Sequence, residues 1–350
     1  MKKMYLLLIL AFAVLPLSAA DKIKELVLAG PKSSVTHPMA YIVEKGLLNN
    51  VAENVKLVIW NNPDQVRSLI AGKQAHFSAV PSYVAATFYN KGVPVRLLNI
   101  SAWGILYMVS SDPKVKTLAD LKGETISMPY RNDMPDIVLK TILSKQGMNP
   151  DKDFKFNYHT SLPSVLQEVM SGKTKHGLLA EPLVSMALMK SKKLAKAGKA
   201  SKLYRAVSLQ KEWGKTFNRD SKIPQAGILA TAKVLDRPDV INAFQKAYKE
   251  AIEWCNNNPE EAGKIVSKYI PGLKPKPIAT ALKNANITFV SAVDSRAELE
   301  YFYNILKETN PAKIGGKLPD DDFYWKAQEE KEMKKVAQRP SINQAQTALH

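Results

Sequence analysis

NNPDQVRSLIAGKQAH at residues 61–76 recurs in altered form as SLPSVLQEVMSGKTKH at residues 161–176, one hundred positions later. Proline, glycine, lysine and histidine stand at the same places in both stretches, and Pro182 answers Pro81 after one inserted residue. Proline at a helix start forfeits no hydrogen bond, and glycine just past a helix end readily takes the left-handed turn that closes it. The match indicates an internal duplication; the alternative is that strand–helix units in general favour this spacing.

Short β-type runs alternate with helical stretches on both sides of these two segments. This alternation predicts strands joined by right-handed helical crossovers, which is an α/β fold with parallel pairing. Strands are predicted at 26–29, 55–60, 76–80, 95–100, 124–128, 155–159, 176–180, 203–208 and 225–231. Helices are predicted at 38–48, 63–71, 82–89, 135–146, 163–171, 182–190, 238–257, 259–269, 275–284 and 295–306.

The duplication predicts two lobes, and 350 residues are enough for two domains. Ligands of parallel sheets bind beyond the carboxyl ends of the strands, so two such lobes face to face form a cleft that hinge bending closes. We expect lobe 1 at 21–105 and 223–336, lobe 2 at 106–222, crossings near 100–112 and 208–223, and a tail without pattern at 337–350.

Residues 1–20 have the pattern of a cleavable export signal. Two lysines precede an apolar run over about 5–17, which is too short to cross a bilayer, and the segment ends in Ser18-Ala19-Ala20. We expect cleavage near Ala20–Asp21 and a mature protein in the periplasm; a short membrane anchor is the alternative. No cysteine follows the small residues, which excludes a lipoprotein anchor.

The charge balance is strongly basic but does not point to nucleic acid. Lysine and arginine total 50 against 32 acidic residues, a net charge of +18, yet only eight of the cations are arginine. Arginine is the residue suited to bidentate contacts with bases and phosphates, so a lysine-rich surface is interpreted as solvated. The densest stretch, KSKKLAKAGKASKLYR at 190–205, is interpreted as a solvated helix end, with contact to an anionic membrane or a partner as the alternative.

Several stretches of the chain resemble a known family, and the resemblance covers about residues 23–310. They are THPMAYIVEKGLL, LIAGK, GETISMPY, MSGKTKHGLLAEP and ILATAKVLDRPDVINAFQKAYKEA. With the export signal, they resemble periplasmic solute-binding proteins of ABC importers, in the group that binds nitrate, sulfonates, taurine or thiamine-pyrimidine precursors. The resemblance implies a two-lobed periplasmic binding protein fold, type II-like, with the ligand cleft between hinged lobes. It also implies a monomer that is not an enzyme and that delivers a small-molecule ligand to a membrane permease.

The chain departs from the family pattern at His76 and His176, where relatives commonly carry aspartate. No carboxylate role can be carried over to these positions, and we interpret both histidines as structural. Two rival functions remain: a periplasmic sensor that reports ligand to a membrane receptor, and a pyrimidine-precursor synthase on the same fold. The synthase would need an iron-binding segment with cysteine, whereas the single cysteine, Cys255, lies in a predicted helix away from the cleft.

Polar and aromatic side chains at the predicted strand ends of lobe 1 are candidates for ligand contact. Thr36 and His37 precede a helix whose N-terminus favours negative charge. The alternative for Thr36 is an N-cap, and the alternative for His37 is a solvated loop residue. Aromatic side chains can stack on a planar ligand, with packing in the core as the alternative. The candidates of this lobe are Thr36, His37, Trp60, Asn61, Ser82, Tyr83 and Trp103.

The second lobe adds a charged pair of candidates. Arg131 stands in a strand-end loop and could hold a carboxylate or sulfonate bidentately, with surface pairing to Asp133 or Asp136 as the alternative. The resemblance puts Glu181 at the cleft mouth, where it could accept from a ligand amine or pair with a lysine. The candidates of this lobe are Tyr130, Arg131, Asn132, His159 and Glu181. Arginine favours an anion and the aromatic residues a planar heterocycle, so sulfonate, nitrate, carboxylate and pyrimidine all stay open.

No catalytic or metal-binding pattern stands out in the sequence. There is no Gly-x-Ser-x-Gly elbow, no His-Glu-x-x-His helix and no glycine-rich phosphate loop. The acidic run at 320–322 lacks calcium-loop spacing. Methionines near His37 could form a soft copper site, but packing is the favoured interpretation. We therefore expect neither a metal nor a cofactor.

Overall fold

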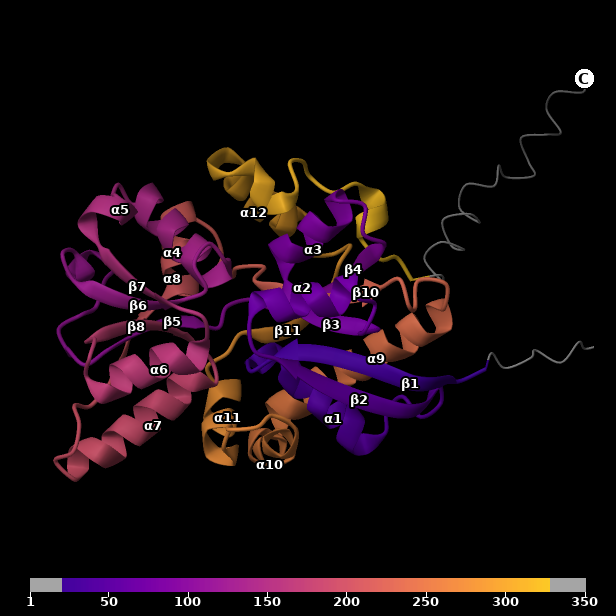
Figure 1. The fold of residues 1–350 in the computed structure, drawn as a ribbon, viewed down its shortest axis with the longest axis horizontal. Helices are drawn as coiled ribbons and strands as arrows, with labels where there is room; N and C mark the ends of the chain where they lie inside the picture. Colours follow the sequence, from indigo (N-terminus) through magenta and orange to yellow (C-terminus); the bar gives the residue numbers. More distant parts are fainter. Residues whose placement is uncertain (1–20, 328–350) are drawn as a thin grey trace, which may run out of the picture.

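Two separate sheets divide residues 21–327, the part of the chain that the computed structural model describes, into two lobes (Figure 1). In lobe 1 the strand order is β11-β4-β10-β3-β1-β2, and in lobe 2 it is β7-β6-β8-β5-β9. The strands of lobe 1 are β1 (Ile23–Pro31), β2 (Ala52–Trp60), β3 (Phe77–Pro81), β4 (Val95–Ala102), β10 (Ala226–Thr231) and β11 (Ile287–Ser291). Those of lobe 2 are β5 (Leu106–Ser110), β6 (Thr125–Pro129), β7 (Lys155–His159), β8 (His176–Ala180) and β9 (Tyr204–Ser208).

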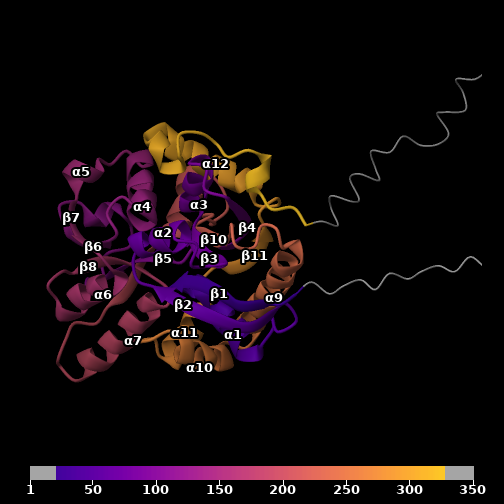
Figure 2. The same cartoon turned by 45° about the vertical axis from the view of Figure 1, so that its right-hand side comes forward.

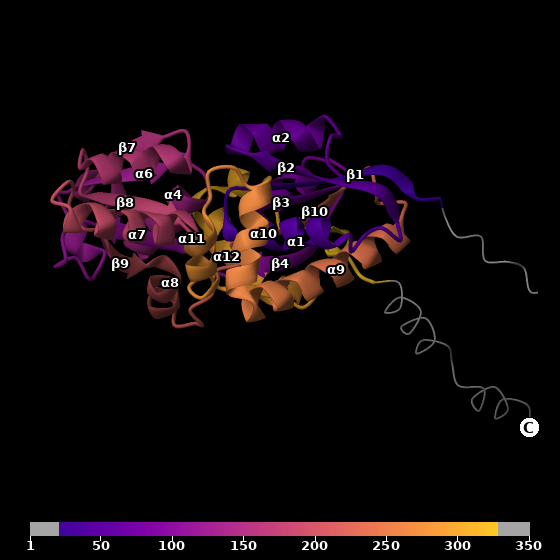
Figure 3. The ribbon, with the colours of Figure 1, turned by 90° about the horizontal axis from the view of Figure 1, so that it is seen from below.

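Helices connect the strands and cover both sheets, as Figures 2 and 3 show from two further directions. The helices of lobe 1 are α1 (His37–Lys45), α2 (Pro63–Ala71), α3 (Ser82–Asn90), α9 (Pro238–Asn257), α10 (Pro259–Tyr269), α11 (Pro275–Leu282) and α12 (Arg296–Thr309). Those of lobe 2 are α4 (Met134–Lys145), α5 (Pro150–Asp153), α6 (Leu162–Ser171), α7 (Leu183–Lys196) and α8 (Leu209–Phe217). Four short 3-10 helices complete the described chain: η1 (Ser34–Thr36), η2 (Ala119–Leu121), η3 (Pro311–Ile314) and η4 (Asp321–Phe323).

The two lobes share one arrangement of strands. In lobe 1 the parallel trio β2-β1-β3 is flanked by the antiparallel β10, and in lobe 2 the parallel trio β7-β6-β8 is flanked by the antiparallel β5. The register pairs the last residues of neighbouring strands, Pro31 with Trp60 and Pro129 with His159. In each lobe, therefore, the loops after these strands leave from one edge of the sheet.

The two repeated segments form the predicted helices α2 and α6, but the C-termini of these helices differ. Asn62 caps α2 and Ser161 caps α6, each accepting the N–H of the residue three positions on. Gly172 takes the left-handed conformation, with φ of 74°, as predicted. Gly72 does not, because its φ is −79° and the following Lys73 takes the positive φ of 53° instead. The prediction of a left-handed glycine is wrong for the first copy.

The sheets are mixed rather than purely parallel, which corrects the sequence prediction. β5 and α8 lie inside the segments expected to be plain crossings, and β11 and α5 were not predicted. The chain passes from β4 in one sheet to β5 in the other through residues 103–105, and it returns between α8 and β10. β5 was missed because it follows β4 after so few residues that the two runs read as one strand and a loop.

Aromatic packing joins helices of lobe 1 to its sheet and to each other. Phe77 of β3 stacks on Phe244 of α9, with ring centroids 4.1 Å apart. Tyr41 of α1 stacks on Trp254 of α9 at 4.2 Å.

Among residues 21–327 there is no helix with the length and apolar character that a membrane crossing requires. The predicted export signal at 1–20 and the tail at 337–350 lie outside the described residues.

Gly227 allows β10 to sit between β3 and β4. A Cβ at this position would overlap the backbone carbonyl of Asn99, which cannot rotate away. We expect Gly227→Ala to lower the free energy of unfolding by about 3 kcal/mol or more, measured by urea denaturation. Gly177→Ala in β8 is the matched control, since its Cβ would meet mainly the side chains of Val169 and Val165. Equal losses in both variants would contradict this explanation.

Candidate functional site

A cavity of about 310 Å³ lies where the strand-end loops of the two lobes meet. Its wall in lobe 1 comes from the ends of β1, β2 and β3 and from the start of α2. Its wall in lobe 2 comes from the start of β5, the loops after β6 and β7, and the end of β8. The second crossing contributes Gln225 and Ala226. The cavity thus occupies the cleft that the two-lobed arrangement predicts.

The wall of the cavity is largely apolar. Valine, leucine, isoleucine, methionine, alanine and proline side chains make up most of it, together with one tryptophan and one tyrosine. Its polar and charged residues are Lys32, Ser33, Asn61, Tyr130, Asp133, Ser161 and Gln225. Among residues 21–327, no arginine lines the cavity. Such a lining suits a ligand with an apolar body and a few hydrogen-bonding groups.

Three helix N-termini point at this cavity but offer few free donors. Pro63, Pro135 and Pro163 line the wall, and each stands in the first two positions of α2, α4 or α6. A proline has no N–H to donate. The cap side chains of these three helices bond to N–H groups of their own first turns. The N-termini are therefore poorly equipped to cradle a small anion.

Three of the predicted residues, Trp60, Asn61 and Tyr130, line the cavity. Trp60 is 5% exposed, and its buried indole N–H has no partner among the described residues. The Tyr130 hydroxyl donates to the Asn61 carbonyl across the cleft at 3.1 Å and accepts the Leu162 N–H at 3.4 Å. Burial raises the pKa of Tyr130 to about 12, so its phenol keeps its proton at neutral pH. These residues give the cavity an aromatic wall with an unused donor.

Three other candidates in lobe 1, Thr36, His37 and Ser82, are not among the residues that line the cavity. The Thr36 hydroxyl donates to the Pro31 carbonyl at 2.7 Å, and the Ser82 hydroxyl donates to the Pro224 carbonyl at 2.5 Å. His37 is completely buried, neither of its ring nitrogens has a partner within residues 21–327, and this burial lowers its pKa to about 3. The structure does not bring these three residues to the cavity, and their contact with ligand stays a prediction.

The remaining aromatic candidates of lobe 1 also lie elsewhere. Trp103 is buried at the first crossing, where its indole donates to the Thr288 carbonyl at 3.0 Å. Tyr83 is 4% exposed and borders a separate hollow beside Arg67 and Lys313. Burial first, and then the Asp133 charge, raise the pKa of Tyr83 well above its ordinary value. Both residues are placed by packing rather than by the cavity.

In lobe 2, Arg131 is not among the residues that line the cavity. It is exposed, and its guanidinium carbon lies 5.3 Å from the centre of the Tyr158 ring. Asn132 is exposed too, while His159 is half-buried at the end of β7 and does not line the cavity. An anion-binding role for Arg131 inside this cavity lacks support from its position, and the contacts of all three residues stay predictions.

Glu181 is fully buried and engaged within its own lobe. Its carboxylate accepts from Arg205 at 2.5 Å and from the N–H and hydroxyl of Ser185 at 3.0 and 3.1 Å. The Arg205 guanidinium in turn stacks 4.2 Å from the centre of the Tyr107 ring. The partner of Glu181 is thus an arginine, and neither the ligand amine nor the lysine expected from the sequence.

The two departures from the family pattern have structural partners. His76 Nδ1 accepts the Val27 N–H at 3.0 Å, which requires a neutral ring, and burial lowers the pKa of His76 to about 4. His176 Nδ1 lies 3.0 Å from the Ser110 hydroxyl, and burial lowers its pKa as well. Neither histidine lines the cavity.

Sequence reasoning missed several residues of the cavity wall. Ser33, Asp133 and Ser161 stand in the predicted strand-end loops, so the same signal that selected Tyr130 could have selected them. Gln225 and the start of β5 reach the cavity only because the crossings run beside it. No local pattern in the sequence marks those positions.

The lobes and the cavity between them define a periplasmic binding protein fold, and solved structures confirm it. An ABC transporter structure from Parabacteroides distasonis matches with a TM-score of 0.69 and 22% identity, over 87% of this chain and 99% of that chain. The periplasmic nitrate-binding protein NrtA from Synechocystis PCC 6803 matches with a TM-score of 0.66 and 16% identity, over 91% and 90%. The alkanesulfonate-binding protein SsuA from Xanthomonas axonopodis pv. citri, bound to MOPS, gives 0.62 and 14%, over 87% and 98%.

The family is shown by the sequence itself. The model of the NMT1/THI5-like family matches residues 43–262, so the chain belongs to this family. No curated protein sequence matches the chain. Together with the structural neighbours, this assignment confirms the family resemblance and the fold class inferred from the motifs.

His37 allows a test of the buried environment at the start of α1. An unfolded histidine has a pKa near 6.5, whereas that of His37 is about 3, so the unfolded state takes up the proton first as the pH falls. Stability is therefore fully present above about pH 6.5 and is lost on acidification toward pH 3. Between pH 7 and pH 4.5 the unsubstituted chain should lose about 2 kcal/mol more of its free energy of unfolding than the His37→Leu variant, measured by urea denaturation. If the free energies of unfolding of the two proteins fell in parallel with pH, the burial of a neutral His37 ring would be contradicted.

Proposed function

We propose that this protein is the extracytoplasmic solute-binding component of an ABC importer. The observation that carries the proposal is the largely apolar cavity between the two lobes, with walls contributed by both. Two crossings link the lobes, which permits hinge bending around a bound ligand. The names of the nitrate-binding and alkanesulfonate-binding neighbours support the same class of function. The export signal predicted at 1–20 would take the chain to the periplasm, where as a monomer it would deliver its ligand to a permease.

Of the ligand classes that the sequence left open, a planar heterocycle of pyrimidine type has the best support. Trp60 and Tyr130 offer aromatic surface, and Asn61, Ser161 and Gln225 offer groups that can pair with ring nitrogens and exocyclic atoms. A nitrate ion would leave most of a cavity of about 310 Å³ unfilled. Sulfonates and carboxylates would need positive donors that the wall scarcely provides. A small aromatic ring with polar edges fits both the size and the lining.

The structure contains no observation that favours the synthase alternative. Cys255 is buried in α9, and burial raises the pKa of its thiol to about 12. Within residues 21–327, no group of three or more histidine, cysteine or acidic side chains is placed to hold a metal ion.

A thermal-shift screen of the mature protein, residues 21–350, tests the proposal. The protein would first be unfolded and refolded to remove carried-over ligand, then heated with hydroxymethylpyrimidine, nitrate, taurine, alkanesulfonates and aromatic carboxylates. A ligand at a hundredfold excess over its Kd stabilises the folded state by about 2.7 kcal/mol, enough to move the Tm by several degrees. We expect the heterocycle to produce the shift. A shift by nitrate or sulfonates alone would overturn the ligand class, and silence with every class would count against a solute receptor.

Trp60 provides the matched test of the cavity as the binding site. Trp60→Ala removes the aromatic wall, and we expect it to weaken the ligand found in the screen by about tenfold or more, measured by isothermal titration calorimetry. Trp254→Ala is the control, since Trp254 stacks on Tyr41 outside the cavity and its loss should lower stability without changing the Kd. A Kd that changes equally in both variants would place the ligand elsewhere.

A further inference from the structure

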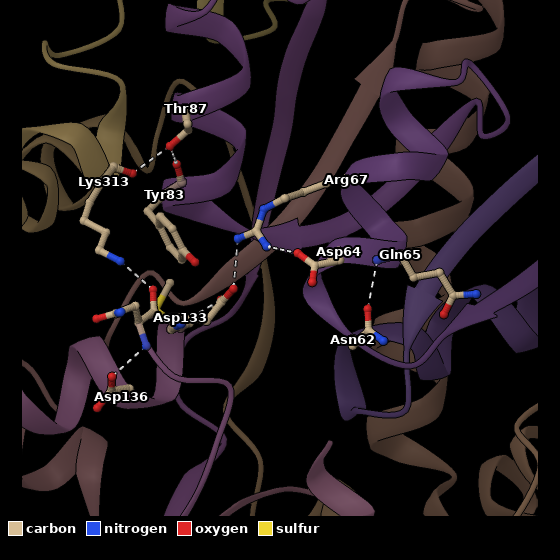
Figure 4. A network of polar contacts seen from close by, with 11 residues as sticks. Asn62, Asp64, Gln65, Arg67, Tyr83, Thr87, Asp133, Asp136 and Lys313 are labelled. Carbon is tan, nitrogen blue, oxygen red and sulfur yellow. Dashed lines mark hydrogen bonds and ion pairs between the residues drawn. The ribbon is translucent and has the colours of Figure 1, made fainter. Parts of the chain in front are cut away.

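An ion pair joins the two lobes beside the cavity. Arg67 of α2 in lobe 1 donates from Nη2 to Oδ2 of Asp133 in lobe 2, at 3.0 Å (Figure 4). The Asp133 side chain is only 7% exposed and that of Arg67 is 42% exposed. Asp133 also lines the cavity and caps α4, accepting the Met134 N–H at Oδ1. The Asp133 carboxylate therefore lines the cavity, caps the N-terminus of α4 and pairs with an arginine on the other side of the cleft.

The loop that carries Asp133 makes two more contacts across the cleft. The Tyr130 hydroxyl donates to the Asn61 carbonyl, and Lys313 of η3 donates from Nζ to the Asn132 carbonyl at 2.6 Å. Tyr130 and Asn132 have φ of 55° and 60°, a conformation that residues other than glycine adopt at some cost. Figure 4 shows Lys313, Tyr83 and Arg67 converging on this loop from lobe 1. This loop is thus one of several places where the lobes touch. Elsewhere the Tyr107 hydroxyl donates to the Asn284 carbonyl at 2.6 Å, and the ring of Trp213 in α8 packs against that of Phe302 in α12.

The ion pair decides what charge the cavity presents to a ligand. Arg67 touches a wall residue, and its fork is already occupied by Asp133 and, at 3.1 Å, by Asp64 of its own helix. An anionic ligand would meet the Asp133 carboxylate, and the described residues that line the cavity include no guanidinium. The wall has one other charged residue, Lys32, whose ammonium is a hydrated point charge on a flexible stem rather than a fixed fork.

We propose that Asp133 sets the charge selectivity of the cavity: by holding Arg67 across the cleft, it closes the lobes without a ligand charge and keeps anions out. Arg67 and Asp133 are then positioning residues for the site, because they bring its two walls together. The selectivity half of this inference rests on the proposed function, since it takes the cavity to be the ligand site. The closure half does not, because the ion pair joins the lobes in the free protein.

Closure is tested without any ligand, by the distance between spin labels in double electron–electron resonance. Ser68→Cys on α2 and Lys152→Cys on α5 place labels at exposed positions of the two lobes, while the buried Cys255 stays unlabelled. We expect a short distance in dilute buffer. Asp133→Asn keeps the cap, since asparagine caps as well as aspartate, and should raise the population with the longer distance about fivefold.

Two controls accompany this measurement. Asp64 is the other partner of Arg67; its side chain is 95% exposed, and it lies on the same helix as Arg67. The substitution Asp64→Asn should therefore leave the label distances unchanged. Raising NaCl from about 0.05 M to about 1 M should open the unsubstituted protein in the same direction as Asp133→Asn, and this readout does not depend on the folding of a variant. Distances that ignore both salt and Asp133→Asn, or that shift equally with Asp64→Asn, would overturn the closure.

Selectivity is tested with two probes of one shape, benzoate and benzamide, by thermal shift and calorimetry. Benzoate should not stabilise the unsubstituted protein. Asp133→Asn should gain benzoate binding by about tenfold or more, because Arg67 becomes free, with little change for benzamide. Arg67→Gln should open the lobes without that gain. Benzoate binding to the unsubstituted protein, or no gain in Asp133→Asn, would overturn the selectivity. If the lobes open as expected while no compound of the earlier screen binds, the proposed function fails and the closure stands.

Discussion

The structure depends on one constraint, which is that parallel neighbours in a sheet end at the same edge. The trio β2-β1-β3 in lobe 1 and the trio β7-β6-β8 in lobe 2 each satisfy it, and the crossings turn the two edges toward each other. The loops after these strands then share one space, and the cavity is what remains between them. Residues far apart in the chain, such as Asn61 and Tyr130, become neighbours for this reason.

The same constraint brings helix N-termini to the cavity, and the sequence then changes what they offer. A bare N-terminus attracts anions. Here prolines replace donors in α2, α4 and α6, and the caps bond within their own helices. The Arg67 guanidinium meets a carboxylate of the opposite lobe. A fold that favours anions by its geometry thus presents a cavity that is mainly apolar and aromatic.

The predicted internal duplication would account for the common strand order of the lobes, and the differences lie where each lobe meets other parts of the chain. β10 fills in lobe 1 the place that β5 fills in lobe 2, although the two strands come from unrelated parts of the sequence. Gly227 lets β10 approach the carbonyl of Asn99 in β4. His76 and His176 occupy equivalent positions but bond to different partners, a backbone N–H of β1 and a hydroxyl of β5. The two lobes therefore share a strand arrangement but differ in their local contacts.

The sequence by itself determined the parts that follow from local patterns. Proline starts, glycine ends and apolar runs predicted α2, α9, α10, β7 and β8 with their observed bounds, because caps and periodicity act within a few residues. The same local patterns also located Trp60, Asn61 and Tyr130, because the end of an apolar strand run can be identified from the sequence. Tertiary structure alone decided that β5 and β11 are strands, that Arg131 faces Tyr158 and that Arg67 pairs with Asp133. Those outcomes depend on which segments meet across a cleft, and no short-range pattern encodes the distance between residues 66 positions apart.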